Sequence, residues 1–309
     1  MGSGRWDEKE WERYATTHVS EKRTVEAIYT SKTMDKDLDP KNIKMRESCD
    51  SVDNPNSTPL IVALDVTGSM GSVLDVMARE GLKTLATEVY NRKPITDPHM
   101  MFMGIGDVEV GDEAPLQVTQ FEADIRIAEQ LTQIWLEKGG GSNKYESYAL
   151  AWYFASLYTR IDSFEKRSKK GFLFTIGDEF PTPYLLGRDI ERITGINPQF
   201  NKISAEELLT MVSRQYEVYH IIVEEGNCFR RHGADVTKEW KDLLGQRVIN
   251  LSDHTKLSEV IVSTLQVANG TDTDSVVSSW DDKSTALVVE KAISALSNGA
   301  KGSGGLIRF

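Results

Sequence analysis

The chain alternates between two hydrophobic patterns over residues 59–268. Short, almost wholly apolar runs are typical of strands buried on both faces of a parallel sheet. Longer segments with apolar residues three and four positions apart are typical of helices that pack on such a sheet. The predicted strands cover residues 60–65, 100–107, 114–121, 171–179, 217–225 and 247–253. The predicted helices cover residues 71–92, 124–137, 146–160, 204–215, 234–245 and 255–268.

This order predicts an α/β fold with a doubly wound, mostly parallel sheet and helices on both of its faces. Residues 114–121 alternate between apolar and polar and follow the acidic turn 107–113, so we expect one antiparallel edge strand there. Ligands of such sheets bind beyond the carboxyl ends of the strands, where the topology switches. Asp65, Asp107 and Asp178 all stand at predicted strand ends. Asp107 is interpreted as a residue of the hairpin turn.

Both ends of the chain differ from this central pattern. Residues 1–57 are rich in Asp, Asn, Ser and Pro, which favours a polar N-terminal extension running across the surface. Residues 58–269 form the main predicted domain, and residues 270–309 form a C-terminal tail with one helix. That helix could dock on the main domain or on a partner. The short helices expected in the two end segments cover residues 8–17, 21–31 and 286–297.

Charge and cysteine content narrow the class of protein. The chain has 36 basic and 47 acidic residues, a formal net charge of −11. This balance argues against a general nucleic-acid binder and against docking on an anionic membrane. The two cysteines, Cys49 and Cys228, are far apart and lack metal-ligand spacing, so we expect reduced thiols and a cytoplasmic protein. No apolar stretch approaches the length needed to cross a bilayer, and the start lacks the apolar core of a signal peptide.

The first predicted strand ends in three oxygen-bearing side chains at alternate positions, Asp65, Thr67 and Ser69. A carboxylate and two hydroxyls are hard donors, which suit Mg²⁺ or Mn²⁺ and suit zinc poorly. Gly68 lets the backbone turn where a side chain would clash. The helix predicted to start near Gly71 adds the positive end of its dipole near this loop. The pattern predicts a divalent-cation site, although the same residue types also favour a simple turn with a helix cap.

Two later segments could complete such a site. The glycine-rich stretch EKGGGSNKYES offers the hydroxyl of Ser142, and Asn143 or Glu146 could supply the donor instead. The same stretch could also be a flexible linker between two helices. The strand-end segment TIGDE brings Asp178, which could hold the metal through a water molecule, while Glu179 is interpreted as a solvated neighbour.

The segment DVTGSM resembles the Asp-x-Ser/Thr-x-Ser motif of the von Willebrand factor A (vWA) domain, which forms its metal-ion-dependent adhesion site (MIDAS). The glycine-rich loop resembles the second element of that site, where the family usually has a threonine and this chain has Ser142. TIGDE resembles the third, an aspartate at the end of a later strand. The resemblance covers residues 59–269 and implies a Rossmann-like vWA fold. It implies the metal ligands Asp65, Thr67, Ser69, Ser142 and Asp178.

The resemblance also implies a function. In the family, Mg²⁺ (or Mn²⁺ or Ca²⁺) keeps an open coordination position that an acidic side chain of a partner protein fills, and no bond is broken. This chain is therefore expected to be a metal-dependent protein-binding module of the stand-alone bacterial or phage type. Some relatives of that type work beside an AAA+ ATPase, so by analogy such an ATPase is a candidate partner.

Two other functions stay open at this point. DVTGSM also resembles the aspartate motifs of P-type ATPases and of haloacid-dehalogenase phosphatases, in which Asp65 would be the nucleophile of an Mg²⁺-dependent phosphohydrolase. Those phosphatases need a second aspartate as general acid, where this chain has Thr67, and the ATPases need transmembrane helices. The third alternative is a structural or scaffold protein with an idle metal site.

Overall fold

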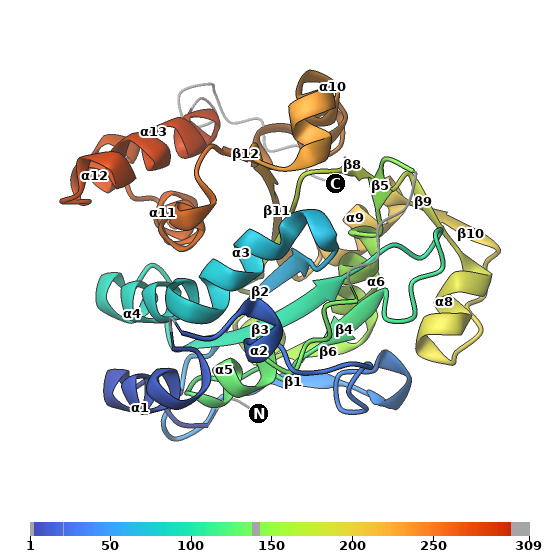
Figure 1. Ribbon diagram of the computed structural model, residues 1–309, viewed down its shortest axis with the longest axis horizontal. Coiled ribbons are helices and arrows are strands. Elements are labelled where there is room, and N and C mark those ends of the chain that lie inside the picture. The colour runs from blue at the N-terminus through green and yellow to red at the C-terminus, as the bar shows by residue number, and fades with distance from the viewer. Residues whose placement is uncertain (1–2, 21, 138–142, 298–309) are drawn as a thin grey trace.

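A six-stranded sheet forms the centre of the molecule (Figure 1). The computed structural model describes residues 3–20, 22–137 and 143–297. The strands of the central sheet are β2 (Thr58–Asp65), β3 (Pro98–Ile105), β4 (Leu116–Val118), β7 (Gly171–Gly177), β11 (Tyr216–Val223) and β12 (Val248–Leu251). Their spatial order is β12-β11-β7-β2-β3-β4, and only the β3–β4 pair is antiparallel. The predicted doubly wound sheet with one antiparallel edge strand is therefore confirmed.

The register of this sheet sets the carboxyl ends of β2 and β7 side by side. Leu64 of β2 pairs with Ile176 of β7 on one side and with Gly104 of β3 on the other. The chain moves from β2 toward β3 on one side, and from β7 toward β11 on the other. The β2–β7 boundary is thus the switch point of the topology, where α/β sheets commonly bind ligands.

Helices cover both faces of the sheet and divide the core in two. Alternate residues of β2 point to opposite faces, so Leu60 and Val62 join one cluster while Ile61 and Ala63 join the other. The helices on the first face are α3 (Gly71–Val76), α4 (Leu82–Arg92), α5 (Arg126–Leu131), α11 (Leu257–Ala268), α12 (Thr273–Ser278) and α13 (Lys283–Ser297). The helices on the second face are α6 (Ala149–Leu157), α8 (Gly187–Thr194), α9 (Ala205–Val212) and α10 (Asn227–Leu244).

The two end segments pack on this core. Helix α1 (Glu8–His18) buries Trp11 and Tyr14 against the first face, although its composition is mostly polar. The C-terminal helix α13 buries Val289 and Ile293 in the same cluster, so it docks on the main body of the chain. The other elements of the N-terminal segment are α2 (Val25–Ile28), the 3-10 turn η1 (Pro40–Asn42) and β1 (Arg46–Ser48).

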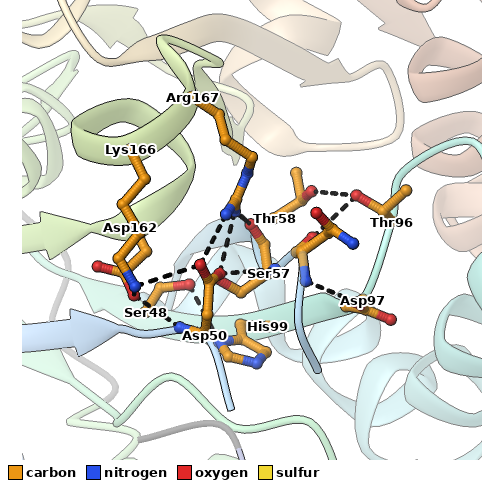
Figure 2. Close-up of polar contacts among 11 residues, drawn as sticks. Ser48, Asp50, Ser57, Thr58, Thr96, Asp97, His99, Asp162, Lys166 and Arg167 are labelled. Atoms are coloured by element: carbon orange, nitrogen blue, oxygen red, sulfur yellow. Dashed lines mark hydrogen bonds and ion pairs between the residues drawn. The ribbon is translucent and has the colours of Figure 1, made fainter. Parts of the chain in front are cut away.

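A charged network ties the N-terminal segment to α7 (Asp162–Arg167), as Figure 2 shows. The Asp50 carboxylate accepts two hydrogen bonds from the Arg167 guanidinium, at 2.7 and 3.0 Å, and two from Ser57. The ammonium of Lys166 lies 3.3 Å from Asp50 and 2.7 Å from Asp162. Close by, Ser48 hydrogen bonds His99 at 3.0 Å. The contact between Asp50 and Arg167 joins residues 117 positions apart in sequence.

Tertiary hydrogen bonds shorten the predicted helix 124–137 to α5. The side chain of Gln117 accepts from the backbone N–H of Trp135 at 2.8 Å and donates to its carbonyl at 2.9 Å. The Glu137 carboxylate accepts the backbone N–H groups of Glu113 and Ala114. Backbone groups that the helix would have used are therefore bonded to the β4 region, and the predicted extent was wrong.

Short strands replace the ends of other predicted helices. The predicted helix 146–160 is reduced to α6 because a short strand forms at each of its ends. At the start, β5 (Tyr145–Glu146) pairs with β8 (Phe180–Pro181), and at the end, β6 (Thr159–Ile161) pairs with β1. The predicted helix 21–31 shrinks to α2 in the described residues. The helix predicted at 234–245 begins earlier, at Asn227, and has a break at His232. The sequence did not predict α7, α8, α12, β9 (Tyr184–Leu186) or β10 (Lys202–Ser204).

Several local signals were read correctly. The helix after the β2 loop begins at Gly71, as predicted. Ser204 and Glu207 form a capping box at the start of α9, where the predicted helix also begins. The segment 71–92 is helical throughout, but a π-helical stretch, η3 (Met77–Gly81), separates α3 from α4. The remaining 3-10 turns are η2 (Gly68–Met70), η4 (Gly245–Arg247) and η5 (His254–Lys256).

Candidate metal centre

Asp65 is the last residue of β2 and is almost fully buried, with 1% of its surface exposed. Its Oδ1 accepts the backbone N–H of Thr67 at 2.8 Å, and the side chains of Glu179 and Thr67 approach the carboxylate closely enough to hydrogen bond it. Its Oδ2 is buried and has no hydrogen-bond partner. A buried anionic oxygen without a donor is costly, because water no longer solvates it. The position therefore calls for a cation or a proton.

Asp178 and Glu179 approach Asp65 from the neighbouring strand. They follow directly after β7, and one carboxylate oxygen from each of these three residues lies within 4.8 Å of the others. Asp178 is fully buried, and its Oδ2 accepts the backbone N–H of Cys228, in the first turn of α10, at 2.7 Å. Glu179 is half-buried, and its carboxylate belongs to this cluster. The interpretation of Glu179 as a solvated neighbour was therefore wrong.

Burial and mutual repulsion keep the acidic groups of the site from ionising together. Burial raises the pKa of Asp65 to about 6, and the charge of Asp178 contributes to this increase. Burial, followed by the charges of Asp65 and Asp178, raises the pKa of Glu179 to about 12. Among the described residues, neither Asp65 nor Glu179 forms an ion pair with a basic side chain. Because no positive group compensates them, these carboxylates fit a bound divalent cation.

Glu146 and Tyr148 form a second layer beside the three carboxylates. Glu146 is buried with an unpartnered Oε2, and burial together with the Asp65 charge raises its pKa to about 11. The Tyr148 hydroxyl donates to the Glu179 carboxylate at 3.4 Å. A Cβ atom on Gly177 would lie 1.8 Å from this hydroxyl, so only glycine at the end of β7 lets Tyr148 reach the site.

Asp107 lies in the β3–β4 connection, as expected for a turn residue, but it is also buried. Its carboxylate accepts hydrogen bonds from the Asn143 amide and, at 3.4 Å, from the Ser147 hydroxyl. Asp107 therefore holds the β3–β4 connection against the segment that leads into α6. Asn143, a candidate ligand from the sequence, is engaged with Asp107.

The structure brings together some of the predicted ligands. Asp65 and Asp178 lie side by side, and Thr67 hydrogen bonds Asp65. Glu146 lies close enough for its charge and that of Asp65 to interact. Ser142 and the side chain of Ser69 lie outside what the structure describes.

Sequence reasoning missed the contributions of Glu179 and Tyr148. Glu179 could have been found because it directly follows a predicted ligand at a strand end. Tyr148 had no such signal, because a tyrosine that leads into the aromatic segment 152–158 is more typical of a packed core than of a site. A second acidic group elsewhere, Glu225, Asp253 and His254, also has its ligand atoms within 4.8 Å, but it is more exposed and His254 Nδ1 lies 2.6 Å from Glu225.

Comparisons with known proteins leave the family open. No protein-family model matches the chain, and no curated protein matches it. Among solved structures, the chain resembles the pilus adhesin SpaC from Lactobacillus rhamnosus GG in its open conformation, with 8% identity and a TM-score of 0.45 over 77% of this chain and 31% of that chain. Another structure of the same adhesin gives 10% identity and a TM-score of 0.47 over 71% and 31%. This chain therefore spans less than a third of the adhesin's length, and a likeness at this level carries no functional argument. Within the described ranges, no helix is both long and apolar enough to span a bilayer.

Proposed function

We propose that this chain is a metal-dependent protein-binding module of the vWA type, with its cation held at the β2–β7 switch point. The observation that carries the proposal is the buried, unpartnered Oδ2 of Asp65 beside the carboxylates of Asp178 and Glu179. The central strand order, with β4 antiparallel at one edge, agrees with the resemblance of DVTGSM and TIGDE to that family. The location follows the general rule for ligands of doubly wound sheets.

Asp65, Asp178 and Glu179 are the proposed carboxylate ligands, with Thr67 as a hydroxyl donor. Mg²⁺ bound there would supply an electrophilic position for an outside carboxylate. The sequence suggested one or two carboxylates, whereas three converge, so a divalent cation would already be neutralised. A partner's acidic side chain therefore has to displace Glu179. Glu179 is the carboxylate best able to move, because it is half-buried whereas Asp65 and Asp178 are buried.

Replacement of Asp65 tests this proposal. Asp65→Ala is expected to remove the heat of Mg²⁺ binding, measured by titration calorimetry, and to leave the far-UV circular dichroism unchanged. Asp189→Ala serves as a control, because Asp189 lies on α8 and its only described ion pair is a 3.8 Å contact with an exposed arginine. Equal heats for the wild type and Asp65→Ala would refute the site.

Capture of partners tests the binding function itself. Proteins retained from a lysate in Mg²⁺ and released by EDTA are expected to disappear with Asp65→Ala. The candidate AAA+ ATPase and the cytoplasmic location belong to this proposal, and mass spectrometry of the retained proteins checks the former. Retention that is unaffected by EDTA and by Asp65→Ala would favour a scaffold with an idle site.

The phosphohydrolase alternative makes a different prediction. Its aspartyl-phosphate would form on Asp65, and a second acid two positions later would have to act as general acid. Thr67 occupies that position and donates to Asp65. We therefore expect no turnover of a generic aryl phosphate in Mg²⁺, and steady turnover that is lost in Asp65→Ala would revive the enzyme.

A further inference from the structure

Basic residues gather beside the carboxylate site although the chain as a whole is acidic. The basic rim consists of Lys144, immediately before β5, and Arg230 and Arg231 in the first turns of α10; all three are exposed. Figure 1 shows β5, β8 and α10 together beyond one edge of the sheet. No ion pair is recorded for these three residues within the described part of the chain. They are therefore available to an outside group.

Contacts place this rim at the mouth of the site. The Lys144 ammonium lies 4.2 Å from the centre of the Phe180 ring, and Phe180 directly follows Glu179. The Phe180 backbone N–H also donates to the Lys144 carbonyl at 3.1 Å. On the other side, the ring of His232 lies 6.2 Å from Phe180, which brings the start of α10 to the same residue.

The start of α10 reaches the site through a second contact. The Cys228 backbone N–H donates directly to Asp178. Arg231 follows Cys228 by three residues on the same helix, so the two side chains are neighbours on the helix surface. Further along α10, Lys238 pairs with Asp242 and lies away from this first turn.

We propose that the basic rim docks an acidic peptide segment of the partner protein, one carboxylate of which reaches the metal site while neighbouring carboxylates pair with Lys144 and Arg231. This inference rests on the proposed function. An acidic ligand approaching a chain of net charge −11 meets repulsion, and a local basic patch beside the site offsets it. A nucleic acid fits less well, because its regularly spaced phosphates need a longer basic surface and the adjacent carboxylates repel them.

The test uses the full chain and a fluorescein-labelled peptide of alternating glycine and glutamate, followed by fluorescence anisotropy in Mg²⁺ or in EDTA. Arg231→Glu and Lys144→Glu are each expected to weaken peptide binding about fivefold to tenfold at low salt, since reversing one exposed charge is worth about 1 kcal/mol. Mg²⁺ binding, measured by calorimetry, is expected to stay within about twofold of the wild type. Arg188→Glu is the matched control, because Arg188 is another exposed helical arginine on α8.

The outcomes separate the rim from the metal site. Mg²⁺-dependent peptide binding that both rim reversals leave unchanged overturns the rim and spares the proposed function. Peptide binding that persists in EDTA and in Asp65→Ala, but falls in the rim variants, overturns the metal-dependent function and keeps the rim. Absence of peptide binding, or tighter binding of a single-stranded oligonucleotide of equal charge, overturns the acidic-peptide assignment.

Discussion

Backbone N–H groups hold two carboxylates of the metal centre in place. Thr67 donates to Asp65, and Cys228 donates to Asp178. Such donors favour the charged form of a carboxylate, but here burial and mutual repulsion outweigh them at Asp65. Close approach of the backbone also requires a small residue, and Gly226 supplies it. A Cβ atom at Gly226 would lie 2.1 Å from Cγ of Asp178.

Gly226→Ala is therefore expected to displace Asp178. Alanine can adopt the local backbone conformation, with φ −69° and ψ 158°, so the nearest steric conflict is with the Asp178 side chain. We expect a loss of about 1–3 kcal/mol in the free energy of unfolding and a loss of about tenfold or more in Mg²⁺ affinity. Urea unfolding and calorimetric titration measure the two effects.

Gly71→Ala gives the matched comparison on the other side of the site. Gly71 begins α3 with φ −54°, and a Cβ atom there would have nothing within 4 Å. This variant should keep the wild-type affinity and should be at least as stable. Wild-type Mg²⁺ affinity in Gly226→Ala would show that Asp178 does not need its observed position.

Among single residues, the sequence predicted those site residues that stand at a recognisable position in the hydrophobic pattern. Asp65 and Asp178 stand at the ends of apolar runs, so their approach could be foreseen from parallel strands alone. Glu179 shares that position, but which of two adjacent acids turns toward a site depends on the loop that follows. The same holds for Glu146, whose burial results from the unpredicted pairing of β5 with β8.

At the scale of elements, α10 is coupled to the site at two points. Its first turn binds Asp178, and near its other end the Trp240 indole N–H donates to the Glu179 carbonyl at 2.9 Å. Trp240 is fully buried and stacks on His220 with ring centroids 3.5 Å apart. Burial lowers the pKa of His220 well below its usual value, so this imidazole is neutral at pH 7.

Trp240→Phe is expected to loosen Glu179 while the fold persists. The change leaves a carbonyl without its donor and a gap in the core, so the free energy of unfolding should fall by about 2–4 kcal/mol. Mg²⁺ affinity should also fall, because Glu179 is no longer held beside Asp65. Chemical unfolding and calorimetry measure these changes.

Trp280→Phe controls for the loss of an indole donor. The Trp280 N–H donates to the Ser263 hydroxyl at 2.9 Å on the first helical face, away from the carboxylates. It should reduce stability without changing Mg²⁺ affinity. If the two variants change affinity equally, α10 has no specific role in positioning Glu179.

Element prediction succeeded where burial gave a long, regular pattern. The strands of the parallel sheet are nearly continuous apolar runs, because both of their faces are covered. Strands of two or three residues, such as β5 and β8, are too short to show any period. The helix predicted over 124–137 failed because Gln117, distant in sequence, binds the backbone of Trp135.

At the scale of the whole molecule, the polar composition of residues 1–57 did not predict how the N-terminal segment packs on the sheet. A few apolar residues, Trp11, Tyr14 and Leu38 among them, bury it on the first face of the sheet. Its polar residues add the network around Asp50, which joins the segment to α7 beside the amino end of β2 (Figure 2). Sequence patterns describe neighbours along the chain, so a contact between residues 50 and 167 was outside their reach.

The Asp50 network gives the segment a dependence on pH that can be worked out in sign. Burial acts to raise the pKa of Asp50, but hydrogen bonds from Arg167 and Ser57 outweigh it and hold that pKa well below its usual range. A depressed carboxyl pKa adds stability above the unfolded value of about 3.8, and this stability is lost as the pH falls further. Asp50→Asn should therefore lower the free energy of unfolding by about 1–2 kcal/mol at pH 7, because it removes the charge from a half-buried, hydrogen-bonded ion pair. Below pH 4 the difference between variant and wild type should shrink, which urea unfolding across the pH range measures. The control Asp242→Asn removes an exposed carboxylate and should change the free energy of unfolding by less than about 0.5 kcal/mol. A difference that stays constant down to acid pH would mean that Asp50 holds the segment by packing and not by its charge.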